Sequence, residues 1–189
     1  MSGRTRGQLP LPLPVRSPAV TKQASERTDE RPLLMSLRPR FAQAILDGSK
    51  TVELRRTRVS AQPGTTIIIY ASAPIMSVVG LARLISVHTD TPARLWRRHR
   101  KNLALSRAEF DNYLAGAEAG TCLTLEPPQR LHTPYELAWL RDYAAFRPPQ
   151  SYRYLAEHDP EPLHTLVATS ARFATGRRFN CTVGLESKS

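Results

Sequence analysis

The sequence contains little cysteine, and this scarcity limits the kinds of protein it can encode. The chain has 189 residues and only two cysteines, Cys122 and Cys181, with no CxxC spacing. Two such residues are too few for a disulfide framework. The five histidines are scattered, and neither cysteine lies at metal-ligand spacing from them. We therefore expect reduced thiols, a cytoplasmic protein and no bound metal.

Long apolar runs and phosphate-binding glycine motifs are also missing. No apolar run reaches the roughly 18 residues that a membrane-spanning helix needs, and the N-terminus has no signal-peptide h-region. Neither GxGxxG nor GxxxxGK[ST] occurs, and no internal repeat is visible. These absences lead us to expect no membrane contact and no cofactor.

Acidic residues are few relative to basic ones. The chain has 27 Lys and Arg against 16 Asp and Glu, for a formal charge of +11. Residues 33–155 carry seventeen basic and nine acidic side chains, so most of the excess lies there, and nearly all of it is arginine. Such a balance favours a polyanionic partner, with nucleic acid first. The alternative is that an arginine-rich genome raises the count without any function.

Composition divides the chain into three parts. Residues 1–32 are rich in proline, serine and charge, which predicts a disordered basic, Pro-rich arm. Residues 33–155 carry the periodic apolar patterns of one folded domain. Residues 156–189 are expected to be a mostly irregular tail, with one further element possible over 163–173.

Within 33–155, short strand patterns alternate with short helices. Strands are expected at 33–37, from 51, and at 65–71, 78–87 and 121–125. Helices are expected at 39–46 before Gly48, from Thr91-Pro92, and from the capping box Ser106–Glu109. A second capping box, Thr133–Glu136, predicts another helix start. The pattern indicates an α+β fold, a small mixed β-barrel of about five to six strands with short flanking helices, rather than a doubly wound sheet.

The most informative stretch is Gly48-Ser-Lys-Thr-Val-Glu-Leu-Arg55. The pattern changes from helical to period two after Gly48, so Val52 and Leu54 are expected to face a core. Lys50 then lies at a helix-to-strand turn beside Glu53 and Arg55 on the strand. Such a cluster can bind an anion or move a proton. The alternative is an ion pair on a solvated strand, which would contribute little.

A second candidate region is the segment after Pro92. Arg94, Arg97 and Arg98 begin a run of basic residues that interleaves with apolar ones. Basic and aromatic residues together are typical of a nucleic-acid surface, although a solvated helix face would look the same. Glu109 has a capping role available before any chemical role.

The order of these motifs resembles the ASCH domain, a branch of the PUA-like superfamily. The resemblance covers about residues 33–155 and is most specific at 48–55. It extends to Pro148-Pro-Gln-Ser-Tyr152, which is similar to the ending of ASCH proteins described as predicted transcriptional regulators. It implies a small PUA-like β-barrel with a cleft beside Lys50, Glu53 and Arg55, and an association with RNA or modified nucleotides.

Three functional hypotheses follow. In the leading one, the protein is a nucleic-acid-binding module, for RNA first. Lys50 and Arg55 contact phosphate or a base edge, Glu53 orients them, Tyr70 offers a stacking face, and the basic run adds nonspecific attraction. A monomer is the default.

The second hypothesis is a hydrolase of RNA or of an acylated nucleoside, with Lys50 and Glu53 as an acid/base pair. The amidohydrolase type of ASCH protein implies a lysine, a threonine three residues on and a later glutamate. Lys50 and Glu109 match, but Glu53 occupies the threonine position, which argues against that mechanism. The third hypothesis is a pocket for a small anionic metabolite.

Overall fold

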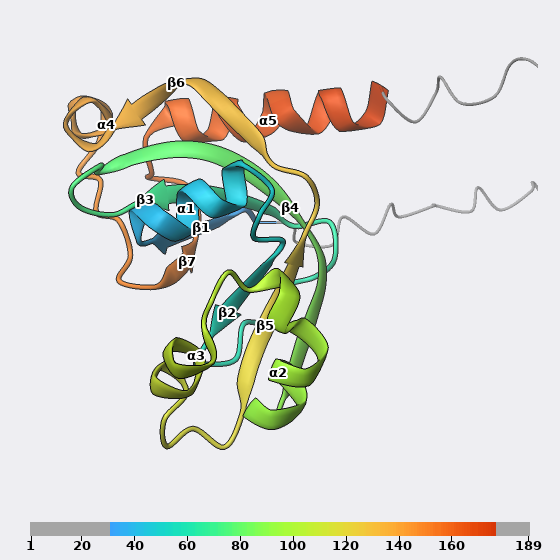
Figure 1. The fold of residues 1–189 in the computed structure, drawn as a ribbon. Coiled ribbons are helices and arrows are strands. Elements are labelled where there is room, and N and C mark those ends of the chain that lie inside the picture. Colours follow the sequence, from blue (N-terminus) through green and yellow to red (C-terminus); the bar gives the residue numbers. More distant parts are fainter. Residues whose placement is uncertain (1–30, 177–189) are drawn as a thin grey trace, which may run out of the picture.

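The protein is described by a computed structural model over residues 31–176 (Figure 1). Five α-helices, one short 3-10 helix and seven strands make up this part of the chain. In chain order they are β1 (Leu33–Leu37), α1 (Pro39–Leu46), β2 (Val52–Arg55), β3 (Thr66–Ala71), β4 (Ser77–Asp90), α2 (Pro92–His99), η1 (Arg100–Asn102), α3 (Arg107–Tyr113), β5 (Gly120–Leu125), β6 (Gln129–Glu136), α4 (Leu137–Tyr143), β7 (Tyr152–Tyr154) and α5 (Glu161–Gly176).

The long strand β4 organises the sheet. Its first half, from Ser77 to Arg83, pairs antiparallel with β3, and its second half, from Leu84 to Asp90, pairs antiparallel with β5. Strand β6 adds to the other edge of the first half. Figure 1 shows β4 as a long curved ribbon that runs through both halves of the molecule. Strand β4 therefore joins the half of the sheet that contains β1, β3 and β7 to the half that contains β2 and β5.

The sheet is mixed and open. The strand order is β2-β5-β4-β3-β1-β7, with β6 on β4. Among the strands of residues 31–176, only β1 and β3 pair in parallel, and they are joined through α1 and β2. The predicted α+β class is confirmed, but the sheet has seven strands rather than five to six. It does not close into a barrel, because β2 and β7 remain the two ends of the strand path among the described residues.

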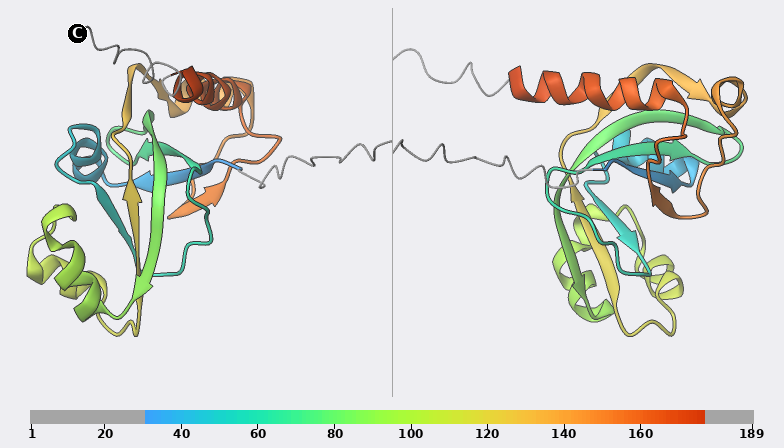
Figure 2. Two further views of the ribbon diagram at one scale, coloured as in Figure 1. Left: turned by 90° about the vertical axis from the view of Figure 1, so that its right-hand side faces the viewer. Right: turned by 180° about the vertical axis from the view of Figure 1, so that it is seen from behind.

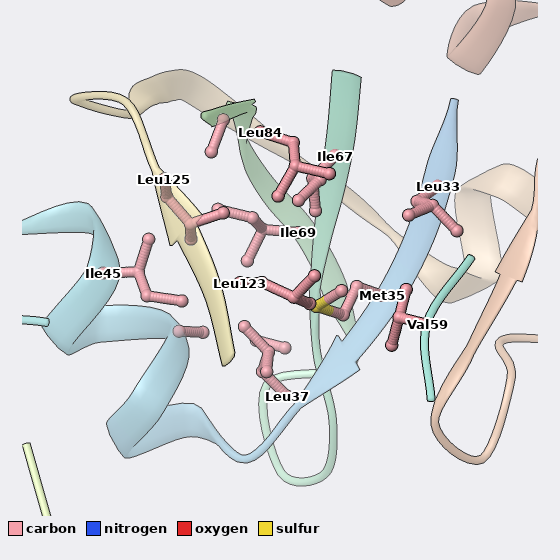
Figure 3. Packing of buried hydrophobic residues seen from close by; sticks show 13 residues of the cluster. Leu33, Met35, Leu37, Ile45, Val59, Ile67, Ile69, Leu84, Leu123 and Leu125 are labelled. Carbon is pink, nitrogen blue, oxygen red and sulfur yellow. The ribbon is translucent and has the colours of Figure 1, made fainter. Parts of the chain in front are cut away.

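Three apolar clusters form the core. The first lies between β1, β3, β5 and helix α1, and Figure 3 shows Ile45 of α1 facing Leu123, Leu125 and Ile69 of the strands. The second fills the opposite face of β1 and β3 under α4 and α5. The third lies between β2, β5 and the helices α2 and α3. Figure 2 shows the same division, with α5 crossing the outside of one half and α2 and α3 attached to the other.

Two predicted segments differ in extent from the structure. The further element that was considered possible over 163–173 is α5, which spans Glu161–Gly176 and buries Leu163 and Leu166 in the second cluster. The expected capping box at Thr133–Glu136 is instead the end of β6, where Tyr135 pairs with Val78 and Glu136 with Ser77. The helix that this box was expected to open is nevertheless present as α4, which begins at Leu137. The arm was expected over residues 1–32, and its residues 1–30 lie outside the described residues. Residues 177–189 of the expected tail also lie outside them.

No helix within residues 31–176 is both long enough and apolar enough to cross a membrane.

Candidate functional site

The turn after α1 places the sequence-predicted cluster. Gly48 has φ +81°, a left-handed conformation that glycine adopts without steric cost. The backbone N–H of Lys50 then donates to the carbonyl of Ala44 at 2.9 Å, which ends the helix and directs the chain into β2. Val52 and Leu54 pack in the third core cluster. The alternation of β2 therefore sends Glu53 and Arg55 to the other face, as predicted.

Lys50, Glu53 and Arg55 form a continuous buried network of charges. The Lys50 Nζ lies 3.3 Å from Glu53 Oε2, and the Arg55 Nη2 lies 3.2 Å from Glu53 Oε1. The three residues are only 2%, 5% and 6% exposed. The alternative of an ion pair on a solvated strand is therefore wrong. One carboxylate between two cations leaves the network with a formal charge of +1.

The ammonium group of Lys50 is fully engaged. It donates to the carbonyl oxygens of Val52 at 2.9 Å and Leu103 at 2.7 Å, in addition to its contact with Glu53. An ammonium has three donors, so no N–H is left for a ligand. Burial lowers the pKa of Lys50 from its ordinary value, and the neighbouring Glu53 carboxylate acts in the opposite direction. Lys50 therefore ties the α1–β2 turn to the segment that follows η1.

Arg55 connects β2 to the far end of the strand path. Its Nη1 donates to the Ser151 hydroxyl at 3.0 Å, and its Nη2 donates to the carbonyl of Ser36 at 3.2 Å. Two buried polar atoms here have no hydrogen-bond partner among the described residues: Arg55 Nε and Ser36 Oγ. Native structures pair most buried polar atoms, so these two atoms have hydrogen-bonding capacity that the described residues do not use.

Glu109 lies outside this buried network. It forms the predicted capping box with Ser106 at the start of α3, and its Oε1 is 2.6 Å from Arg40 Nη1. Hydrogen bonds from the Ser106 backbone, from Arg40 and from the Ser106 hydroxyl lower the pKa of Glu109 to about 2. The carboxyl group is therefore ionised throughout the physiological range and is poorly suited to donate a proton.

Tyr70 lies in the core. Its side chain is 4% exposed and belongs to the second apolar cluster with Leu34 and Val78. Burial raises the pKa of its hydroxyl, and the positive charge of Arg141 acts in the opposite direction. In β3 it pairs with Ser36 of β1. The ring leaves no open face on which a base could stack, so its surroundings give no support to the predicted stacking role.

The basic segment after Pro92 is a surface. Arg94, Arg97 and Arg98 of α2 are exposed, as are Arg100 and Lys101 of η1. Arg94 is 3.6 Å from Asp90, whereas the other four side chains form no ion pair with the described residues. Residues 92–102 contain no acidic residue. We call these five residues the α2 basic face; its helix is held by Leu95, which is fully buried in the third cluster.

The structure thus brings together three of the predicted site residues and separates the rest. Lys50, Glu53 and Arg55 form one network, Arg94, Arg97 and Arg98 lie on α2, and Glu109 and Tyr70 lie apart from both. Ser36 and Ser151 were not predicted as site residues, although Ser151 lies in the Pro148–Tyr152 segment that carried the resemblance. Within residues 31–176, no group of three or more His, Cys, Asp and Glu side chains is arranged to hold a metal ion.

The chain is similar to proteins that carry the same domain. Residues 33–151 match a family described as "Domain of unknown function (DUF365)". An "ASCH domain-containing ribonuclease" of Zymomonas mobilis is 34% identical over 141 residues, which cover 74% of this chain and 95% of that protein. A large ribosomal subunit protein uL22 of Ureaplasma parvum is 24% identical over 138 residues, 72% of this chain and 43% of that protein.

The likeness extends to three dimensions. The crystal structure of ASCH from Zymomonas mobilis has a TM-score of 0.67 at 34% identity and covers 74% of this chain and 96% of that chain. The fold and the match over residues 33–151 agree with the resemblance carried by residues 48–55. This chain therefore belongs to the ASCH-domain family of PUA-like proteins.

Proposed function

We propose that this protein binds single-stranded RNA through the α2 basic face. The observation that carries the proposal is the exposure of Arg97, Arg98, Arg100 and Lys101 without an ion-pair partner among residues 31–176. Unpaired guanidinium and ammonium groups on one face replace the counterions of a phosphate backbone, which makes binding favourable and salt-dependent. The ribonuclease name of the Zymomonas relative and the ribosomal name of the Ureaplasma relative support RNA as the polyanion.

The buried network has a supporting role in this proposal. Lys50 fixes the segment after η1 through the Leu103 carbonyl, and that segment follows the basic face directly in the chain. Buried ion pairs of this kind hold geometry more than they add stability. The leading sequence hypothesis had Lys50 itself contacting phosphate; its burial instead favours a positioning role for it and for Glu53.

The test is RNA binding measured on the whole chain. Fluorescence anisotropy with a labelled single-stranded RNA is compared between the wild type and R97A/R98A. R58A/R147A is the matched control, because it removes the same charge from exposed loop arginines outside α2. We expect weaker binding only for R97A/R98A. Equal affinity of R97A/R98A and the wild type would refute the role of this face.

A second candidate function is RNA cleavage. It is favoured by the 34% identity to a ribonuclease across nearly all of that protein, and by the unpaired Arg55 Nε and Ser36 Oγ beside Ser151. A guanidinium next to a hydroxyl group can stabilise the negative charge that develops on a phosphodiester during cleavage. Here Arg55 would supply the charge, and Ser151 would orient it or contact the substrate.

Cleavage is separated from binding by product formation. End-labelled RNA is incubated with the wild type and with Ser151→Ala, and the products are resolved on a gel. Fragments that form with the wild type and are greatly reduced with Ser151→Ala would support cleavage at this site. Intact RNA in the presence of protein that binds it would leave RNA binding as the function and exclude this second candidate.

A further inference from the structure

A groove separate from the buried network lies between α1 and β6. Its volume is about 380 Å³, within the size range of small-molecule sites. Seven of its ten lining residues are apolar, and the other three are Arg40, Gln43 and Arg130. Lys50, Glu53 and Arg55 do not line it. The groove is therefore distinct from the buried network, although it lies within the same domain.

The backbone is built to bring the two walls of the groove close together. Gly80 lies in β4 between them, and a Cβ atom at this position would lie 2.6 Å from Leu46 Cδ2 and 2.8 Å from the Gln129 carbonyl oxygen. Only glycine allows α1 to pack this closely against the start of β6. Leu46 and Val79 form part of the apolar surface. These closely packed residues offer an apolar surface against which a planar part of a ligand can lie.

The charged residues that line the groove, Arg40 and Arg130, are both basic. Each has a carboxylate nearby that does not line the groove: Glu109 lies 2.6 Å from Arg40, and the pKa of Asp47 is lowered by the hydrogen bonds it accepts and further by the positive charge of nearby Arg130. Arg130 Nη1 is 3.4 Å from Gln43 Oε1, at the long end of hydrogen-bond distance, so both side chains have polar atoms available to a ligand. A ligand that matches this surface has a flat apolar part and an anionic part. A nucleotide has both.

Arg40 connects the groove to the rest of the site. Its guanidinium lies over the Phe41 ring at 4.3 Å, and the Lys50 ammonium faces the same ring at 5.1 Å. Arg40 also pairs with Glu109 of α3. Arg40 and the ring of Phe41 therefore connect the groove to Lys50, which belongs to the buried network that supports the proposed RNA site.

We propose that the groove between α1 and β6 binds one nucleotide, with the base against the apolar walls and the phosphate on Arg130 and Arg40. This inference rests on the proposed function, because it assigns a nucleotide position to the same RNA ligand. Gln43 contributes hydrogen bonds to the edge of the base. The nucleotide belongs either to an RNA strand or to a free mononucleotide, and the two sources share the same chemistry.

The test is NMR titration of the full-length protein, following the backbone amides of Gln43, Val79 and Leu131. The probes are uridine 5′-monophosphate, uridine, inorganic phosphate and a short oligouridylate. We expect the monophosphate to shift these amides at lower concentration than uridine or phosphate alone. A tighter response to the oligomer identifies RNA as the source, and an equal response identifies the free nucleotide. No shift of these amides with any probe overturns the proposal.

Variants separate this inference from the proposed function. Arg130→Glu is expected to weaken the monophosphate response about tenfold, because it removes a charge-assisted hydrogen bond and adds repulsion. Arg58→Glu, at an exposed loop position that does not line the groove, is the matched control and should leave that response unchanged. RNA binding that persists while the groove amides do not respond refutes the groove alone. A groove that responds to the monophosphate in a protein without RNA affinity refutes the proposed function and retains a nucleotide site.

Discussion

The guanidinium of Arg55 joins two strands that do not pair. Its Nη1 donates to the hydroxyl group of Ser151 at 3.0 Å, across 96 residues of sequence. Arg55 is the last residue of β2 at one end of the strand path, and Ser151 precedes β7 at the other end. The same guanidinium reaches the Ser36 carbonyl on β1. A side chain thus bridges the gap that backbone pairing would close in a barrel.

The contact between Arg55 and Ser151 predicts that a substitution of Arg55 lowers the free energy of unfolding more than a substitution of Ser151 does. Arg55→Met leaves the buried Glu53 with one cation fewer, and we expect it to lower the free energy of unfolding by about 3 kcal/mol. Ser151→Ala removes one hydrogen bond and should cost about 1 kcal/mol. Urea unfolding measures both values. Hydrogen exchange at the Ser36 amide, which donates to the Ser151 carbonyl, should speed up in Arg55→Met. An equal loss in the free energy of unfolding for the two variants would contradict this account of the Arg55 contacts.

Glu53 is predicted to be the residue on which the buried network depends. Glu53→Gln leaves the Lys50 and Arg55 charges buried without their shared carboxylate, so we expect a loss of about 3 kcal/mol in the free energy of unfolding. Glu126→Gln is the matched control, because Glu126 is exposed and forms no ion pair with the described residues. Chemical denaturation measures the free energy of unfolding of both variants. A Glu53→Gln variant as stable as the control would show that the network contributes nothing.

The low pKa of Glu109 predicts how the stability of the folded protein changes in acid. Its pKa of about 2 lies below the ordinary value of 4.5, so its folded-state interactions contribute stability above pH 4.5 that is lost as the pH falls towards 2. Carbon-13 NMR titration of the side chain should show this low pKa. Ser106→Ala combined with Arg40→Met should move the pKa back towards 4.5, because the variant lacks both side-chain donors. A midpoint near 4.5 in the wild type would contradict the arrangement.

Cys122 is predicted to be chemically inert in the folded protein. It is fully buried in β5, and burial raises the pKa of its thiol to about 12. In a Cys181→Ser background, iodoacetamide at pH 8 should label the protein only after denaturant is added. Rapid labelling of the native protein would show that β5 opens to solvent.

The sequence predicted the local features of the site because those depend on neighbouring residues. Gly48 marked the helix end, the alternation of β2 separated Glu53 and Arg55 from Val52 and Leu54, and the Ser106–Glu109 capping box formed as expected. The resemblance at residues 48–55 pointed to the correct family. What the pattern did not reveal was burial. A Lys at a turn and an Arg on an alternating strand look solvated until their partners 53 and 96 residues away are known.

The errors have the same origin. The Thr133–Glu136 sequence fits a capping box, but cross-strand pairing with Ser77 and Val78 keeps it extended, so tertiary contacts override local preference. Helix α5 was not predicted over its full length because only Leu163, Leu166 and Val167 mark its buried face. The open sheet was not predictable either, since the bridge made by Arg55 is a side-chain contact between distant segments.

The most direct test of the account is the salt dependence of RNA binding. The dissociation constant for a labelled single-stranded RNA is measured between low and moderate salt for the wild type, R97A/R98A and the control R58A/R147A. Each lost phosphate contact should flatten the slope of log K against log salt by about 0.7, so R97A/R98A should be flatter by about 1.4. The control should keep the wild-type slope. A wild-type slope and affinity in R97A/R98A would contradict the assignment of RNA binding to the α2 basic face.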